Sequence, residues 1–418
     1  MSQRDRYSAD QLAKIRATLK DTLGDGASKA LENLDSRFVP AQETSDSDEE
    51  GAPKGKKRMD RPTAASKASK IDVEELARSG QIPKMLEALP VVLEDPTKVR
   101  VLIGAILNNG ETKAMHLVDA LSKVHKQADL IDPLVQKIVS LKGLNPLVDA
   151  LKFSTASPNA MRILAQGIAE QGTVNHVLRA IAGAPKNQDE AEVIWSMEVI
   201  GKGSVDQILD AMKLIDPLSP GAVILATGLI NRKGVTPENL VRGMTATKDN
   251  PKASVLVAAT LCRRIEVPGL IGILEKYLPD KCEAAEVVVA QLVHRCVDFS
   301  TRNRDVVDAA RYIKADSMAG QLLALGLIKL DNDEELIRGY RRLPAVSMAR
   351  KMLALAVVKK KGKLMSLRSL GKEGWDLTKD TDAIEKATRV TQARYKWILT
   401  NLLPDDGEDR SGKEAAGA

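Results

Sequence analysis

The sequence predicts an all-α protein: a right-handed α-solenoid of about nine to ten two-helix repeats, preceded by a disordered linker. Two columns of small and aliphatic residues recur about every 31 residues. Hydrophobic residues make up 44% of the chain but aromatic residues only 3%, so the core consists of Ala, Val, Leu and Ile. Such a core suits closely packed helices better than sheets, whose strands are usually richer in aromatic residues.

The composition also restricts the cellular setting. Three Cys in 418 residues do not make a disulfide framework, which indicates a reducing compartment. The first residues, MSQRDRYSADQLAKIR, lack the apolar core of a signal peptide. No stretch approaches the roughly 18 apolar residues of a membrane span. We expect no transmembrane segment and a cytoplasmic protein, or a nuclear one if the source is eukaryotic.

Residues 1–38 are predicted to form an N-terminal helical arm. Apolar residues from Leu12 to Leu23 keep a helical spacing, and a second short series runs from Leu31 to Phe38. The simpler interpretation is a helix that packs against the rest of the protein. The alternative is an arm that recruits a partner or pairs with a second copy.

Residues 39–70 are predicted to be a disordered linker, because large apolar side chains are almost absent and cannot offset the chain entropy. An acidic block, SDSDEE at 45–50, precedes a basic block, KGKKR at 54–58. The basic block is either a solvated part of the linker, which is the more common case, or a nuclear signal or nucleic-acid contact.

The first column belongs to the first helix of each repeat, here called helix A. The pentapeptide LVDAL occurs at Leu117–Leu121 and again at Leu147–Leu151, and its Ala marks a small residue that recurs. The equivalent residues are Ala88, Ala120, Ala150, Ala180, Ala211, Gly243, Ala309, Gly339 and Ser369, with Gly272 in the one missing slot.

The second column belongs to the second helix, helix B. Its small residues are Ala165, Ser196, Ala226, Ala258, Ala290, Ala324 and Ala354. Each follows a bulky apolar residue, and an aliphatic residue stands three positions later. Pro and N-capping residues often start helix B, as in SPNAMRIL. Glycines close several units in what we expect to be C-cap positions: Gly110, Gly143, Gly172, Gly203 and Gly234.

Short helical pairs cannot bury their apolar faces alone, whereas stacked pairs bury one another. We therefore assign residues 71–370 to the solenoid. Residues 371–403 are predicted to hold a longer C-terminal capping helix, and residues 404–418 are predicted to be a disordered polar tail.

The repeats resemble HEAT or armadillo units, in the short form of about 31 residues. The Arg that often follows the start of helix B in HEAT units stands only at scattered positions, such as Arg162 and Arg350. The resemblance covers the solenoid and implies stacked helical pairs with an extended binding surface. It does not imply one function.

A search for chemistry leads us to predict no catalytic residue, no cofactor and no metal. Cys262, Cys282, His294 and Cys296 form the one metal-like group in the sequence. Cys282 and Cys296 bracket one helix B, and an unbroken helix of that length separates its ends by roughly 20 Å. Zinc ligands must converge to about 2 Å from the metal. An enzyme on this scaffold, of the HEAT-like DNA glycosylase kind, would need a concave Trp with a carboxylate, whereas Trp195 stands in the packing column.

One column of charged residues is a candidate binding surface. The residue before the small position of helix A is usually charged and lies about 100° round the helix from it, so it should face solvent. The predicted ladder is Glu87, Asp119, Asp149, Arg179, Asp210 and Arg242. The competing interpretation is an ordinary solvated helix face.

A basic patch is the second candidate. Residues 336–372 contain eleven Lys or Arg and no acid. Ten of them form the predicted patch: Arg338, Arg341, Arg342, Arg350, Lys351, Lys359, Lys360, Lys361, Lys363 and Arg368. Such a patch attracts phosphate backbones, acidic proteins or anionic lipid headgroups.

These features favour a non-catalytic scaffold or adaptor that binds a protein partner on the solenoid surface. The alternative is a nucleic-acid-binding solenoid that uses the basic C-terminal repeats, although the scarcity of aromatic residues disfavours stacking on single strands. Self-assembly through the N-terminal arm is a further hypothesis.

Overall fold

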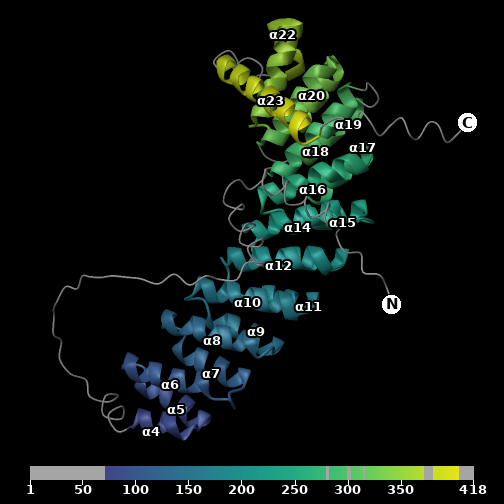
Figure 1. The fold of residues 1–418 in the computed structure, drawn as a ribbon. Helices are drawn as coiled ribbons and strands as arrows, with labels where there is room; N and C mark the ends of the chain where they lie inside the picture. Colours follow the sequence, from purple (N-terminus) through teal and green to yellow (C-terminus); the bar gives the residue numbers. More distant parts are fainter. Residues whose placement is uncertain (1–70, 279–281, 299–302, 314–315, 371–379, 404–418) are drawn as a thin grey trace, which may run out of the picture. The chain divides into compact units, whose positions relative to one another are not determined.

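A computed structural model describes residues 71–278, 282–298, 303–313, 316–370 and 380–403 (Figure 1). Throughout these ranges the regular structure is helical, and they contain no strand. The predicted arm (1–38), linker (39–70) and tail (404–418) lie outside the described residues. The chain divides into two compact units, one that ends at Ile224 and one that begins at Leu225.

The first unit contains ten helices in its described residues and the first residues of an eleventh. They are α4 (Val73–Ser79), α5 (Ile82–Val92), α6 (Pro96–Asn108), α7 (Ala114–Val124), α8 (Ala128–Ser140), α9 (Leu144–Ala150), α10 (Pro158–Gln171), α11 (Val174–Gly183), α12 (Asp189–Lys202) and α13 (Val205–Leu214). The eleventh, α14 (Pro220–Asn231), contains the boundary between the units.

From α4 to α11, each helix of the first unit packs against the helix two positions further along the chain. The helices α5, α7, α9, α11 and α13 form one row of such contacts, which we call row A. The helices α4, α6, α8, α10 and α12 form the other, row B. Neighbours along the chain, such as α7 and α8, join the rows. The predicted A and B helices are therefore sorted into separate rows.

The second unit repeats this pattern. Its helices are α15 (Pro237–Ala246), α16 (Pro251–Arg264), α17 (Val267–Lys276), α18 (Glu283–Val293), α19 (Asn303–Ala309), α20 (Met318–Leu330), α21 (Asp333–Arg342), α22 (Met348–Leu370) and α23 (Thr381–Asn401). The helices α16, α18, α20 and α22 pack in sequence as row B, and α17, α19 and α21 as row A.

The last helix, α23, departs from the alternation and lies across row B (Figure 1). It packs against α18, α20 and α22. The guanidinium of Arg263, at the end of α16, donates to the Leu402 carbonyl at 3.1 Å across 139 residues of sequence. A helix in this position covers apolar surface that row B leaves open, and it falls within the range where the capping helix was predicted.

Both sequence columns form the core. In helix A, Ala120, Ala150, Ala180 and Ala211 are completely buried. In helix B, every small residue of the column is buried, and so are the bulky residue before it and the aliphatic residue three positions later. Burial of one Leu, Ile or Val side chain contributes about 1.5–3 kcal/mol, so these columns are the main source of stability.

The helix starts follow the predicted signals. Ser157 caps α10 by accepting from the Ala160 amide at 3.1 Å, and Pro158 occupies the first turn. Asn250 caps α16 in the same way, before Pro251. Each cap satisfies a backbone donor that the helix itself leaves without a partner.

The structure confirms the predicted C-cap position for two of these glycines. Gly172 and Gly203 are the C-caps of α10 and α12, with negative φ angles of −94° and −79°. A Cβ at either position would lie 2.5 Å from a carbonyl of the preceding turn, so close packing selects glycine there. Gly143 is the N-cap of α9, and among the predicted five only Gly234 has a positive φ, +76°.

Candidate functional surfaces

The predicted charged ladder lies on row A of the first unit, one residue on each helix. Glu87, Asp119, Arg179 and Asp210 are exposed, and Asp149 is half-buried. The remaining member, Arg242, is exposed on α15 of the second unit. The structure therefore places these side chains at the surface in a regular order.

Lysines three or four residues later in the chain pair with three of the four acids of the ladder. Asp119 binds Lys123 at 2.8 Å, Asp210 binds Lys213 at 3.0 Å, and Asp149 lies 3.7 Å from Lys152. Pairs at this spacing contribute only a few tenths of a kcal/mol each. The pairing reduces the net negative charge of the ladder. The main feature of the ladder is therefore the regular spacing of its residues.

The predicted basic patch lies on α21 and α22, which pack against each other. Arg338, Arg341 and Arg342 belong to α21, while Arg350, Lys351 and Lys359–Lys361 belong to α22. The side chains of Lys363 and Arg368 lie outside the described residues.

Acids from outside the basic sequence span lie beside these cations. The ion pairs are Arg338 with Glu334 at 2.6 Å, Arg342 with Asp308 at 2.6 Å, Lys351 with Asp380 at 2.7 Å, Lys359 with Glu385 at 2.7 Å, and Lys360 with Asp331 and Asp333 at 2.7 and 2.9 Å. Residues 336–372 contain no acid, but in the folded protein acids from other segments make this surface one of mixed charge.

The pKa directions agree with this pairing. Hydrogen bonds from Lys360 to Asp331 and Asp333 raise the pKa of that lysine. A hydrogen bond from Lys360 lowers the pKa of Asp333, and one from Lys359 lowers the pKa of Glu385. Each of these shifts favours the charged form of Lys360, Asp333 or Glu385, as expected for side chains that form ion pairs at the surface.

The cysteines of the metal-like group lie on two helices. Cys262 is buried at the end of α16, Cys282 is the half-buried N-cap of α18, and Cys296 is buried in the π-helical segment His294–Asp298. Burial raises the pKa of the Cys262 thiol to about 12, so this thiol is protonated. Within the described residues, no three His, Cys, Asp or Glu side chains come together in a way that could hold a metal ion.

A column of polar residues, most of them at the ends of helices, escaped the sequence analysis. Each side chain donates to a backbone carbonyl 29 to 33 residues earlier, at or shortly after the end of a preceding helix. The bonds are Asn109 to Gly80, Gln171 to Val139, Lys202 to Ala169, Arg264 to Val235, Arg295 to Cys262 and Lys360 to Asp331. We call these six donors the carbonyl-binding column.

The carbonyl-binding column supplies donors to carbonyls near helix ends, where the helix itself leaves backbone acceptors open; the Val139 carbonyl also accepts from the Lys142 amide. Its sequence signal is a long polar residue at the end of helix B, as at 171 and 202 and again at 264 and 295. The residue type changes among Asn, Gln, Lys and Arg, and for this reason an alignment on identity does not reveal it.

Two histidines also have a structural role that the sequence analysis missed. His116 and His176 stand at the third position of α7 and α11, where the Nδ1 atom of each accepts from the N-cap amide, at 3.2 and 3.3 Å. This is the position that Glu or Gln occupies in the usual capping box.

A buried carboxylate lies in the first unit. Glu192 of α12 is 5% exposed, and its Oε2 atom has no hydrogen-bond partner among the described residues. Burial raises the pKa of Glu192, and the nearby Ser219 hydroxyl and Asp216 backbone only partly offset this effect. The group therefore holds its proton to a higher pH than an exposed glutamate.

Within the described residues, no helix combines the length and the apolar character needed to cross a bilayer. Comparisons with protein-family models, with curated proteins and with solved structures found no match to this chain. Its own geometry must therefore support any functional proposal.

Proposed function

We propose that this protein is a non-catalytic scaffold or adaptor, an α-solenoid of HEAT-like or armadillo-like repeats that binds a protein partner along its surface. The small number of cysteines, three in 418 residues, supports a reducing, cytoplasmic setting for this role. The N-terminal arm, residues 1–38, would recruit the partner or join two copies.

The repeat array is supported by the register of its contacts. Residues of the carbonyl-binding column bind partners 29 to 33 residues away, and this interval matches the repeat period of the sequence columns. Other links keep the same interval, such as Gln207 to Asn175 across 32 residues. Contacts that join each repeat to the next at a constant separation in sequence are typical of repeat proteins.

The observation that carries the binding proposal is the charged ladder, which places one charged residue on each row A helix of the first unit, exposed on four of the five helices and half-buried at Asp149. A row with this spacing offers one contact per repeat, which suits an extended partner. The alternative, a grip on a nucleic-acid backbone, needs many unneutralised cations. The ion pairs of α21 and α22 weaken that alternative, since acids already contact most of those cations.

The ladder can be tested by charge reversal within the first unit. In the ladder variant, Asp119, Asp149 and Asp210 are each changed to Lys. In the matched control, Asp129, Glu170 and Glu190 of row B, all exposed, are changed to Lys, so the total charge change is identical. Affinity purification with crosslinking from source cells should recover a partner with the wild type and the control, and lose it with the ladder variant. Equal recovery with both variants would contradict the proposal.

A parallel experiment tests the nucleic-acid alternative. Binding of duplex and single-stranded oligonucleotides is measured at two salt concentrations, with Lys359, Lys360 and Lys361 each changed to Glu in a second variant. Binding that weakens steeply with salt and disappears in that variant would favour the alternative. Deletion of residues 1–70 in the same assays shows whether the arm contributes to partner capture or to the mass of the assembly.

A further inference from the structure

The helix α23 has two faces of different character. Ile384, Tyr395 and Ile398 are buried where α23 packs on α18, α20 and α22. Val390 and Trp397, by contrast, are 51% and 46% exposed. They stand seven residues apart, on one line along the helix and on the side away from the buried residues.

Val390 stands six residues after Ile384, which places it about 120° round the helix from that residue. Ala383 and Ala393, both exposed, extend the same line. We call Ala383, Val390, Ala393 and Trp397 the apolar strip. Among the described residues of the second unit, large exposed apolar side chains otherwise occur only singly, at Tyr277 and Val346.

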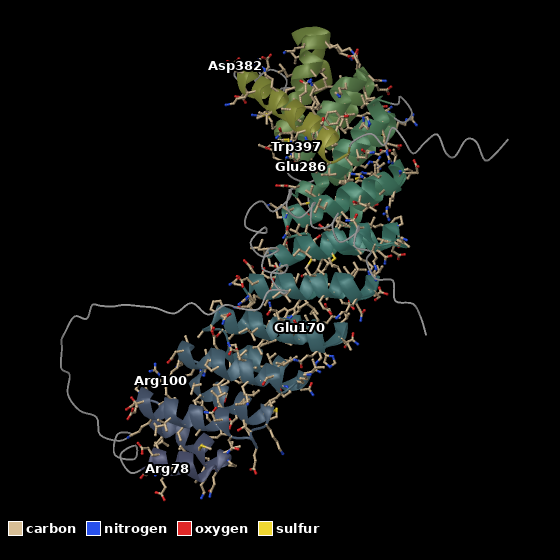
Figure 2. The ribbon with its side chains drawn as sticks, viewed as in Figure 1. Arg78, Arg100, Glu170, Glu286, Asp382 and Trp397 are labelled. Atoms are coloured by element: carbon tan, nitrogen blue, oxygen red, sulfur yellow. The ribbon has the colours of Figure 1, made fainter. Side chains whose placement is uncertain are left out.

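The ring of Trp397 is held in place before any partner arrives. The Arg394 guanidinium lies over the indole ring, 4.8 Å from its centroid. Arg394 in turn donates to Glu286 of α18 at 2.8 Å, and Figure 2 labels Glu286 and Trp397 where the two helices meet. An exposed Trp fixed beside an Arg is the combination that most often dominates binding energy at protein interfaces.

The charge around the part of the apolar strip from Val390 to Trp397 is positive. Lys386, Arg389 and Lys396 are exposed, and Arg389 has only a distant ion pair, with Glu385 at 3.9 Å. No acidic residue occurs in the sequence from Lys386 to Leu403. A second copy of α23 laid on this strip would bring like charges together, which disfavours direct pairing of two α23 helices.

An acidic segment with apolar residues at helical spacing is complementary to this face, and the chain carries one. Residues 31–50 contain seven acids and one base, and Leu31, Leu34 and Phe38 stand at the spacing of one helix face. These residues lie outside the described ranges. We propose that the apolar strip of α23 is a docking surface, and that its occupant is residues 31–50 of this protein.

In this arrangement Leu and Phe side chains cover Val390 and Trp397, while the acids of the segment face Arg389 and Lys396. The apolar contact provides most of the binding energy, and the charges set the orientation and exclude basic segments. The proposal requires only the second unit and the sequence of the segment, so it holds or fails independently of any solenoid partner.

Trp397 is itself the reporter. The chain has three tryptophans. Trp195 is completely buried and therefore inaccessible to acrylamide, and the substitution Trp375→Phe removes the second. Acrylamide quenching of the fluorescence of this full-length variant then reports on Trp397. We expect weak quenching in the Trp375→Phe protein. Quenching should increase when Asp46, Asp48, Glu49 and Glu50 are changed to Asn or Gln. A synthetic peptide of residues 31–50 should then restore protection.

Charge reversal separates specific docking from a general charge effect. The starting protein carries the Asn and Gln substitutions at positions 46, 48, 49 and 50, so its own segment is neutral. Adding Arg389→Glu and Lys396→Glu to this protein should lower its affinity for the 31–50 peptide about tenfold or more, because like charges then meet. The matched control, Lys126→Glu with Lys186→Glu, reverses two exposed lysines elsewhere and should leave the affinity unchanged. In a full chain that carries Arg389→Glu and Lys396→Glu, the substitutions Asp46→Lys, Asp48→Lys, Glu49→Lys and Glu50→Lys should restore protection of Trp397.

Three results would overturn the proposal. The first is strong quenching of Trp397 in the purified full chain, which would leave the strip open for a different protein. The second is protection that survives neutralisation of the acids. The third is protection that falls on dilution whether or not the acids are present, because this would indicate pairing of two α23 helices.

Discussion

Arg394 on α23 binds Glu286 on α18 at 2.8 Å across 108 residues of sequence, and its guanidinium also covers the ring of Trp397. One side chain thus fastens the last helix to row B and orients an exposed aromatic residue. The two partners are mostly buried, with exposed fractions of 29% for Arg394 and 15% for Glu286.

We expect Arg394→Ala to lower the free energy of unfolding of the second unit by about 1–3 kcal/mol, because it leaves a largely buried carboxylate without this partner. Arg389→Ala removes a side chain that is 82% exposed and only 3.9 Å from its acid, and should change stability by less than about 0.5 kcal/mol. Urea titration followed by circular dichroism measures both. Equal effects of the two substitutions would show that the buried pair has no special role.

Two glycines should respond to alanine in opposite directions. A Cβ at Gly326 of α20 would lie 2.7 Å from Val293 Cγ2, so Gly326→Ala should destabilise the protein by about 1–3 kcal/mol. A Cβ at Gly104 of α6 meets nothing within 4 Å, so Gly104→Ala should stabilise it by about 0.5–1 kcal/mol. Thermal unfolding distinguishes the signs, and a stabilising Gly326→Ala would refute the close packing of α18 on α20.

The carbonyl-binding column can be tested at Arg295. This side chain donates to the carbonyls of Cys262, at 2.8 Å, and Ile265. Arg295→Ala should cost about 1.5–3 kcal/mol, as expected for hydrogen bonds from a charged group, while Arg295→Lys should retain part of this stability. Hydrogen exchange of the α16–α17 segment provides a local readout. Unchanged hydrogen exchange in the alanine variant would mean that the column does not hold adjacent helices of row B together.

The capping role of His176 predicts a distinct pattern. His176→Ala removes the acceptor for the Thr173 amide and should cost about 0.5–1 kcal/mol. His176→Glu provides an acceptor at the same position and a negative charge at the helix start, so stability should be preserved or increased. Thermal midpoints of the two variants decide the matter, and a Glu variant as unstable as the Ala variant would contradict this role.

Glu192 makes stability depend on pH. Its pKa is raised in the folded state, so the folded protein binds more protons than the unfolded chain above the ordinary value of 4.5. The contribution of this group to stability therefore falls as pH rises from 4.5 through the folded pKa. Glu192→Gln keeps the shape but does not titrate, so the stability difference between variant and wild type should grow from pH 4 to pH 7. Parallel pH profiles would show that Glu192 does not titrate differently in the two states.

The sequence by itself determined which residues form the core. A small residue is needed wherever two helices approach closely. This requirement recurs at a regular spacing in the sequence, so Ala120, Ala165 and Ala258 can be recognised from their spacing. The all-helical character and the helix starts at Ser157 and Asn250 could be predicted for the same reason, since they depend on local patterns.

Only the tertiary structure decided the character of the surfaces. Asp308 and Asp380 are distant in sequence from Arg342 and Lys351, yet they neutralise these cations, because electrostatic neighbours are set by helix packing rather than by chain order. In the same way, the packing of α23 on row B decides which of its apolar residues are buried, since Ile384 and Ile398 lie inward while Val390 and Trp397 are exposed. Burial of apolar residues is a repeated local requirement that sequence encodes directly, whereas the partner of each charge is known only when the chain is folded.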